Sequence, residues 1–114
     1  LIVSNHGGRQ LDGAPSSIAA LPGIVQAVGK DIEVWMDGGI RSGQDVLKAR
    51  ALGARGTLIG RSFLYGLGAY GELGVTRVLE IIRKELDLTM AFCGRTDINQ
   101  VDTSILLPGT YPTA

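Results

Sequence analysis

The sequence has few of the residues that build metal centres and disulfide bonds. Its 114 residues include one cysteine, Cys93, and one histidine, His6. A single cysteine excludes an internal disulfide, and these two residues leave few ligands for a zinc-type centre. We therefore expect no metal, and any imidazole chemistry must depend on His6.

Excess charge and long apolar runs are also absent. Eleven Lys and Arg balance eleven Asp and Glu, so the formal net charge is +0, which offers no overall field to gather nucleic acid or an anionic membrane. No run approaches the roughly 20 apolar residues of a membrane span, and no charged leader precedes an apolar segment. We expect a cytoplasmic protein that binds no nucleic acid.

Apolar residues instead form three short runs, each followed by a polar turn rich in glycine. The runs cover residues 1–3, 32–36 and 57–59. Continuous apolarity is typical of parallel strands covered on both faces. Residues 15–28 and 42–52 have helical periodicity, with Ser16 or Ser17 and then Ser42 as N-caps. Gly29 and Gly53 follow these helices, where a left-handed stop is favoured.

The second half of the chain is predicted to be mainly helical. Residues 62–70 indicate a short apolar helix interrupted at Gly71, and residues 75–92 a longer amphipathic helix. Glu80 and Lys84 have the spacing of an exposed ion pair. Pro108, Gly109 and Pro112 favour an irregular segment over residues 95–114. The expected buried stripe of the long helix comprises Val75, Val78, Leu79, Ile82, Leu86 and Met90.

The fold class is α/β. Repeated strand–helix units are typical of a doubly wound sheet or of a (β/α)8 barrel. A closed barrel needs about 250 residues, so three such units supply only part of one. Since Leu1 stands inside what reads as a buried strand, we expect the chain to begin within a larger fold.

The first polar turn carries a base and an anion anchor. In S-N-H-G-G-R-Q-L-D, His6 and Arg9 follow a strand and flank a glycine pair that permits a sharp turn. Alone, His6 is better explained as a turn cap and Arg9 as a surface charge. Asp12 is expected to support the local turn or Arg9.

The next two turns, D-G-G-I-R-S-G at residues 37–43 and I-G-R-S at residues 59–62, both lead into helices. Backbone N–H groups at a helix start favour a phosphate, and Arg41 or Arg61 adds charge. Each turn alone is also explained as an ordinary tight turn beside a solvated arginine. Together they favour one shared phosphate ligand, although Walker and Rossmann motifs are absent.

As a set, these three motifs resemble the FMN-dependent α-hydroxy acid oxidases and dehydrogenases. The resemblance rests on S-N-H-G-G-R-Q-L-D, D-G-G-I-R-S-G-Q-D-V-L-K-A and A-L-G-A-R-G-T-L-I-G-R, in the family's order. It implies a TIM barrel in which the three runs are the sixth, seventh and eighth strands. Residues 1–114 would be the C-terminal part of one domain, with barrel units in 1–94 and an irregular tail in 95–114.

The resemblance also implies roles for individual residues. His6 would be the catalytic base, since a neutral imidazole accepts a proton near neutral pH, and Arg9 would hold the substrate carboxylate in two parallel bonds. The substrate would be an L-2-hydroxy acid, lactate-like, oxidised to the 2-oxo acid. The residues implied to bind FMN are Ser4, Asp37, Gly38, Gly39, Ile40, Arg41, Gly60 and Arg61.

Several matters stay open at this point. The electron acceptor is oxygen, a quinone or a cytochrome, and the resemblance implies a homo-oligomer, with peripheral association at the inner membrane as the alternative to a cytoplasmic location. The fragment alone is expected to be inactive, because other family site residues come from earlier strands. Another FMN-binding barrel enzyme, such as an isomerase, and a non-catalytic phosphate-binding module remain alternatives. The residues expected to serve packing are Trp35, Phe63, Tyr65, Tyr70 and Cys93.

Overall fold

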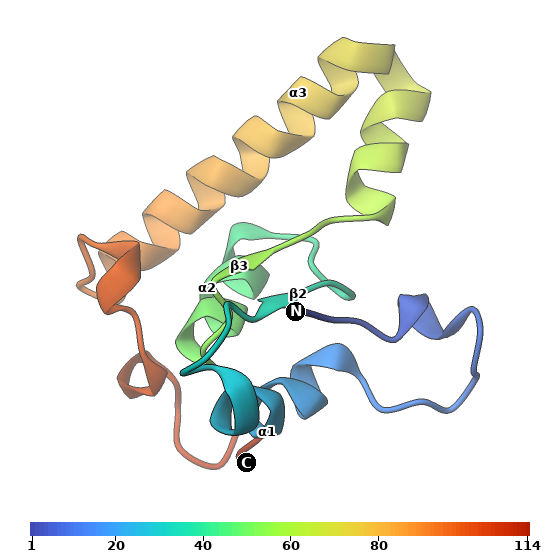
Figure 1. Ribbon diagram of the computed structural model, residues 1–114. Coiled ribbons are helices and arrows are strands. Elements are labelled where there is room, and N and C mark those ends of the chain that lie inside the picture. Colours follow the sequence, from blue (N-terminus) through green and yellow to red (C-terminus); the bar gives the residue numbers. More distant parts are fainter.

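The computed structural model describes all 114 residues and contains three successive strand–helix units. The chain runs through β1 (Ile2–Val3), α1 (Ser17–Val28), β2 (Trp35–Met36), α2 (Gly43–Ala51), β3 (Gly56–Thr57) and α3 (Arg61–Phe92), as Figure 1 shows. Three short 3₁₀ turns are η1 (His6–Gly8), η2 (Ile98–Gln100) and η3 (Thr103–Ile105). The α/β alternation predicted from the sequence is confirmed.

The strands form one parallel sheet in the order β1-β2-β3. Val3 is paired with Met36, and Met36 in turn with Thr57. Because all three strands run in one direction, their carboxyl ends meet at one edge of the sheet. The three polar turns of the sequence follow at that edge.

The paired strands are shorter than the apolar runs predicted. Ile32 donates a backbone hydrogen bond of 3.0 Å to Val28 O, so it belongs to the turn that closes α1 rather than to β2. At β3, pairing starts at Gly56, and Leu58 N still reaches Met36 O at 2.9 Å. Apolarity therefore marked the right regions but extended beyond the paired residues.

Helices cover only one face of the sheet. Val3, Val34 and Met36 are buried in one cluster with Leu21 of α1 and Ala49 of α2. On the other face the apolar side chains lack cover within this chain: the exposed fraction is 53% for Ile2, 37% for Trp35 and 41% for Leu58. The prediction that both faces are buried is therefore wrong for the chain as it stands.

The predicted helix starts are confirmed. Ser16 Oγ accepts a hydrogen bond from Ala19 N at the start of α1, and Ser42 forms a capping box with Asp45 at the start of α2. At the helix ends, Gly53 has the expected positive φ of 102°. Gly29 does not, with a φ of −65°, because it remains right-handed and its N–H still bonds Val25 O.

The last helix bends back on itself. Tyr70 and Gly71 leave helical geometry within α3, with φ 60° and ψ −138° at Gly71. Two arms result, visible in Figure 1 as the yellow-green and orange parts of α3. Gly66 and Gly74 lie in backbone contact between the arms, where an added Cβ would overlap the facing chain. The interruption predicted at Gly71 is thus confirmed.

Several side chains of α3 are more exposed than predicted. Leu79 is exposed whereas Ile82 is buried, so the buried stripe is narrower than expected. Glu80 pairs with Arg77 at 3.2 Å, at i,i+3 spacing, and not with Lys84 as predicted.

Aromatic packing is also weaker than predicted. Tyr65 and Tyr70 are exposed on the first arm of α3, and only Phe63 is half-buried. Cys93 follows the last residue of α3 but is exposed, so it is not a buried hydrophobe.

Residues 95–114 form no element longer than a 3₁₀ turn, as predicted, yet they pack closely. Val101 is buried with Leu47 and Ala51 of α2. Arg50 Nε donates to Ile98 O at 3.1 Å, which ties the tail to the same helix. Among the helices, none combines the length and apolar character that crossing a membrane requires.

Candidate functional site

The turn after β1 is left-handed over three successive residues. His6, Gly7 and Gly8 have φ of 53°, 62° and 70°, and His6 is the chain's only non-glycine residue with positive φ. Ser4 Oγ accepts a hydrogen bond of 3.1 Å from His6 N. A left-handed conformation costs an L-residue roughly 1–2 kcal/mol, and such strain tends to cluster at functional sites. The glycine pair explains why only His6 bears it.

The side chains of His6 and Arg9 both lie exposed on this turn. None of the chain's ion pairs involves Arg9. Asp12 instead accepts a bond of 3.1 Å from Gly13 N, so it supports the local turn and not Arg9. The proposed base and anchor are therefore both accessible to a ligand.

The turn after β2 is anchored in the core and carries an unpaired acceptor. Ile40 is buried, and its carbonyl accepts a hydrogen bond of 3.3 Å from Ser62 Oγ. Asp37 Oδ1 is buried without a hydrogen-bond partner. An unpaired buried polar atom costs about 1–3 kcal/mol, and more if charged, so this oxygen marks a position that a donor would stabilise.

The start of α2 is already occupied by carboxylates. Asp45 Oδ2 accepts from Arg41 N and Ser42 N, each at 3.0 Å. Glu85 Oε2, from the distant helix α3, accepts from Gly43 N at 2.9 Å. The sequence predicted free N–H groups here for a phosphate. In this structure the N–H groups of Arg41, Ser42 and Gly43 are instead bound by two acidic side chains.

The start of α3 is open. No side chain caps its first turn, and an added Cβ on Gly60 would meet no atom within 4 Å. The first N–H groups of a helix have no partner within it and favour an anion. Arg61 is exposed at the same position. Of the two predicted phosphate sites, the start of α3 is the one whose backbone N–H groups have no side-chain cap.

The turns approach one another at the carboxyl edge of the sheet. A Cβ added to Gly7 would lie 3.8 Å from Arg61 Nη2, which places the third turn beside the first. A Cβ added to Gly38 would lie 3.1 Å from Ser17 Oγ and 3.7 Å from Asn5 Oδ1, which joins the second turn to the first. Predicted residues from all three turns thus share one region.

Positive charge at this edge is unneutralised. Arg9, Arg41 and Arg61 are all exposed and none takes part in an ion pair, whereas the paired arginines lie elsewhere in the chain. Free guanidinium groups beside an open helix start favour a carboxylate or a phosphate. This edge can therefore bind anions even though the chain has no net charge.

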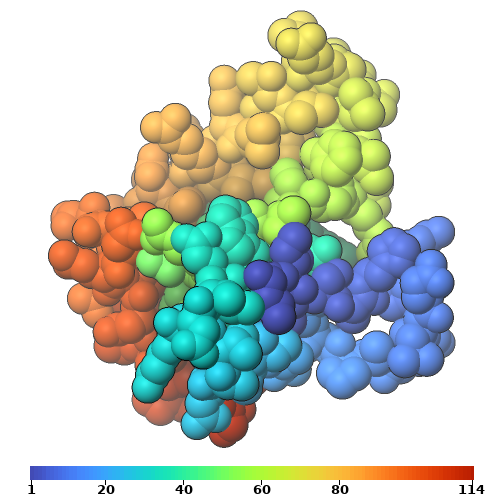
Figure 2. Space-filling view, in the orientation of Figure 1, coloured from blue at the N-terminus to red at the C-terminus, as the bar shows by residue number.

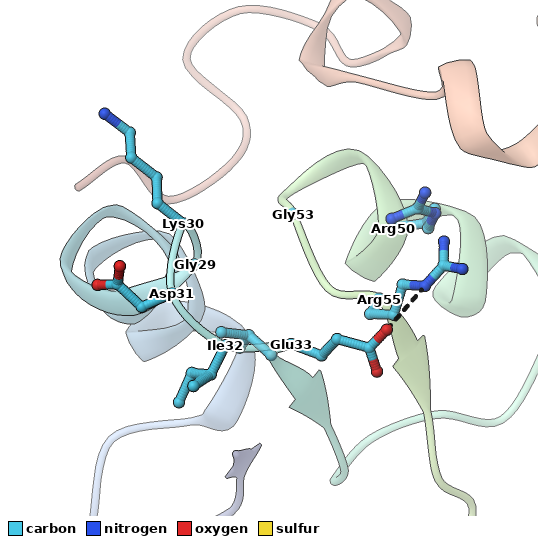
Figure 3. Close-up of a pocket in the computed structure, with 9 residues that line it drawn as sticks. Gly29, Lys30, Asp31, Ile32, Glu33, Arg50, Gly53 and Arg55 are labelled. Carbon is cyan, nitrogen blue, oxygen red and sulfur yellow. Dashed lines mark ion pairs between the residues drawn. The ribbon is translucent and has the colours of Figure 1, made fainter.

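The surface has two hollows beside the sheet. One, of about 630 Å³, adjoins β1 and α1 and includes Ser4, Asn5 and His6 among its lining residues. The other, of about 440 Å³, lies between the turns after α1 and α2 (Figure 3). Its arginines are engaged, since Arg55 pairs with Glu33 at 3.5 Å and Arg50 bonds Ala54 O. Of the predicted site residues, Ser4 and His6 line the first hollow, and none lines the second.

Three residues at the site were not predicted from the sequence. Asn5 holds the turn of His6, Ser17 lies buried beside Gly38 with an unpartnered Oγ, and Glu85 caps α2. An asparagine whose side chain bonds the backbone two residues later is a known turn signal, so Asn5 could have been predicted from the sequence. Ser17 and Glu85 depend on packing between separate elements, which no local pattern reveals.

Comparison with known proteins gives a consistent set of relatives. Residues 1–108 match the family model described as FMN-dependent dehydrogenase. The chain is 55% identical over 107 residues to L-lactate dehydrogenase of Pseudomonas syringae pv. syringae, covering 94% of the chain and 28% of that protein. It is 51% identical over 113 residues to pre-mycofactocin synthase of Mycolicibacterium smegmatis, covering 98% and 28%.

Solved structures agree with these sequence matches. A mutant of the membrane-associated (S)-mandelate dehydrogenase from Pseudomonas putida superposes with a TM-score of 0.87 at 45% identity, covering 91% of this chain and 29% of that one. The chain thus spans less than a third of the length of the relatives it matches.

Proposed function

Because the chain belongs to the FMN-dependent dehydrogenase family, we propose that the complete protein carrying it oxidises an L-2-hydroxy acid to the 2-oxo acid with FMN as cofactor. In this proposal the chain supplies the three C-terminal strand–helix units of a (β/α)8 barrel. The barrel also supplies the catalytic groups that these units lack.

The bare face of the sheet supports the barrel assignment. A barrel interior is filled by side chains from successive strands. Ile2, Trp35 and Leu58 have that position here, apolar and without cover, while both helices α1 and α2 lie on the other face. The apolar part of the hollow beside β1, which includes Leu11 and Ile24, would accept the preceding unit.

The carboxyl edge fits FMN best at its phosphate end. The open start of α3, with Gly60 and Arg61, would bind the phosphate through backbone N–H groups and the guanidinium. Arg41 would add charge from the neighbouring turn. The unpaired Asp37 Oδ1 would accept from a hydroxyl group of the ribityl chain. Ser4, Gly38, Gly39 and Ile40 would contact the cofactor from the same turns.

FMN, when bound, supplies an acceptor for the electron pair that leaves the substrate. Arg9 would hold the substrate carboxylate in two parallel bonds and so fix the carbon that is oxidised. His6 would then remove a proton, either from the hydroxyl or from the α-carbon, and hold it on the imidazole. Their shared loop keeps the base and the anchor at one substrate.

We propose a lactate-like substrate, since the similar proteins include an L-lactate dehydrogenase. The electron acceptor stays open among oxygen, a quinone and a cytochrome. A homo-oligomer in the cytoplasm is proposed, with peripheral association at the inner membrane as the variant suggested by the membrane-associated mandelate dehydrogenase.

The observation that carries the proposal is the approach of Arg61 to the His6–Gly7 turn, 3.8 Å from the Cβ position of Gly7. This approach supports the proposal because the start of α3, proposed to bind the phosphate, lies beside the loop of the proposed base and anchor. The test is the visible spectrum of the complete protein before and after anaerobic addition of L-lactate, glycolate or mandelate. A flavin spectrum that bleaches with one of them is expected, and a protein without flavin would refute the proposal.

The similarity to pre-mycofactocin synthase favours a second candidate, another FMN enzyme of the same family with a different substrate. An isomerase belongs to this class of alternatives. It predicts a flavin spectrum that none of the three hydroxy acids bleaches. A non-catalytic phosphate-binding module predicts a stable monomeric chain without flavin.

A further inference from the structure

One side chain, Asn5, fixes the backbone that carries His6. Its Oδ1 accepts a hydrogen bond of 2.9 Å from Gly7 N, and its Nδ2 donates one of 3.2 Å to Pro15 O. The first bond closes the left-handed turn directly after His6. The second joins the two ends of the loop on which both His6 and Arg9 lie.

This loop has little else to hold it. Residues 6–14 form no hydrogen bond with a helix or strand, and their remaining bonds are local, as between Arg9 N and His6 O. In Figure 2 the loop stands out in blue from the body of the molecule. Its conformation therefore depends strongly on the two bonds of Asn5.

Asn5 also lies against the second turn. It is half-buried, and its Oδ1 is 3.7 Å from the Cβ position of Gly38, in the turn proposed to contact FMN. The same side chain therefore lies beside the proposed cofactor turn and bonds the backbone directly after the proposed base. His6, whose φ is 53°, directly precedes the amide that Asn5 binds, so loss of this bond would remove one restraint on the strained backbone that directs the imidazole.

We propose that Asn5 is a positioning residue that holds the His6 imidazole at the angle required for proton removal. This inference rests on the proposed hydroxy acid oxidation. Asn5 touches neither substrate nor cofactor chemistry in this proposal and acts only through the backbone of His6. A misplacement of about 1 Å at a reacting group can cost on the order of 100-fold in rate.

The test uses the complete FMN-loaded protein and the hydroxy acid that bleaches the wild type. We expect Asn5→Ala to retain FMN but to slow anaerobic flavin reduction by about 100-fold. Hydrogen exchange at the Gly7 amide should become faster, because its acceptor is lost. Combined with His6→Gln, Asn5→Ala should add no further slowing to the residual bleaching, because it acts through His6.

Asn99→Ala is the matched control. Asn99 also holds two groups, Arg50 Nη2 and Arg55 Nη1, but at the opposite edge of the sheet. Its variant should reduce flavin at the wild-type rate. Additive slowing in the double variant, or wild-type reduction by Asn5→Ala, would overturn the inference while the proposed function stands.

Asn5→Ser covers the case in which Asn5→Ala does not hold FMN, since a serine hydroxyl can still accept from a nearby backbone N–H. Asn5→Ser is then combined with His6→Gln, and flavin reduction is compared in the two single variants and the double variant. If neither variant holds FMN while Asn99→Ala does, Asn5 is a folding residue and the inference is wrong. If no hydroxy acid reduces the wild-type flavin, the proposed function fails and this inference fails with it.

Discussion

Glu85 Oε2 accepts a hydrogen bond of 2.9 Å from Gly43 N, so the third helix caps the second. Gly43 is buried under α3, where an added Cβ would overlap the backbone at Leu86. Together with Asp45, Glu85 places negative charge where the dipole of α2 is positive. This arrangement joins two helices and leaves α3 as the helix whose start has no side-chain cap.

Removing the cap should destabilise the protein without affecting the first turn. We expect Glu85→Ala to lower the free energy of unfolding by about 1–2 kcal/mol, the usual cost of losing a helix cap. Glu85→Gln should lose less, because it keeps an acceptor. Urea unfolding of the complete protein measures the difference. Glu80→Ala, on the exposed face of the same helix, should change stability by less than about 0.5 kcal/mol.

At His6, where the backbone is strained, glycine should be more stabilising than alanine, the reverse of the usual order in a helix. Because φ is 53° there, we expect His6→Gly to be more stable than His6→Ala by about 1 kcal/mol. At Lys84, in the regular second arm of α3, the same comparison should favour alanine by about 1 kcal/mol. Thermal unfolding of the four variants checks both signs. Equal stability of the two His6 variants would show that the backbone at His6 is not strained.

Local chemistry explains why part of the molecule could be predicted. The glycine pair after His6 predicted the sharp turn, Ser42 predicted the start of α2, and Gly71 predicted the bend of α3. Each depends on the conformational preference of one or two residues. The three polar turns also predicted the region in which the proposed site residues gather.

What could not be predicted depends on contacts between elements. Glu85 lies 42 residues from Gly43 in the sequence, and only the crossing of α3 over α2 joins them. Apolarity at Ile2 and Trp35 indicated burial, but not whether this chain or other segments provide the cover. The sequence likewise indicated backbone N–H groups at the start of α2, but not that the carboxylates of Asp45 and Glu85 bind them.

Acid should loosen the tail through Asp102. The hydroxyl of Ser104, its backbone N–H and then Arg95 lower the pKa of the Asp102 carboxyl from its ordinary value of 3.8. A lowered pKa adds stability at pH above 3.8 that is lost as the pH falls toward the folded value. NMR titration should show the pKa of Asp102 rising toward 3.8 in Ser104→Ala.

The matching stability experiment compares Asp102→Asn with Asp87→Asn, an exposed residue of α3. On acidification below pH 3.8, Asp102→Asn should lose less stability than the wild type, because it has no carboxylate to protonate. Asp87→Asn should follow the wild type. Parallel curves for all three proteins would contradict a role for Asp102.

Arg9 should bind the substrate carboxylate through a planar pair of bonds. We expect Arg9→Lys to weaken binding of the 2-oxo acid product by about 10–100-fold, since a charge-assisted bond contributes about 1.5–3 kcal/mol. FMN affinity should not change, because the proposed cofactor phosphate lies at α3. The flavin spectrum titrated with product reports the loss. Arg77→Lys on the surface of α3 is the control, and a matching loss there would show that the effect is nonspecific.

The open start of α3 leads to a separate prediction about Arg61 and Arg41. If the phosphate binds at α3, Arg61→Ala should weaken FMN binding to the apoprotein by about tenfold, equivalent to about 1.4 kcal/mol. Arg41→Ala should weaken it less, because Asp45 and Glu85 already bind the backbone N–H groups at the start of α2.

Riboflavin separates a phosphate contact from a general disturbance of the site, because it has the ring and ribityl chain of FMN but no phosphate. The affinity for riboflavin should be the same in the wild type and in Arg61→Ala. The variant should therefore reduce the difference in affinity between FMN and riboflavin. Fluorescence titration of the apoprotein measures both affinities. If Arg61→Ala lowered the affinities for riboflavin and FMN equally, the phosphate would not bind at Arg61. If Arg41→Ala lowered the affinity for FMN alone, and by more than Arg61→Ala does, the phosphate would bind at the turn after β2.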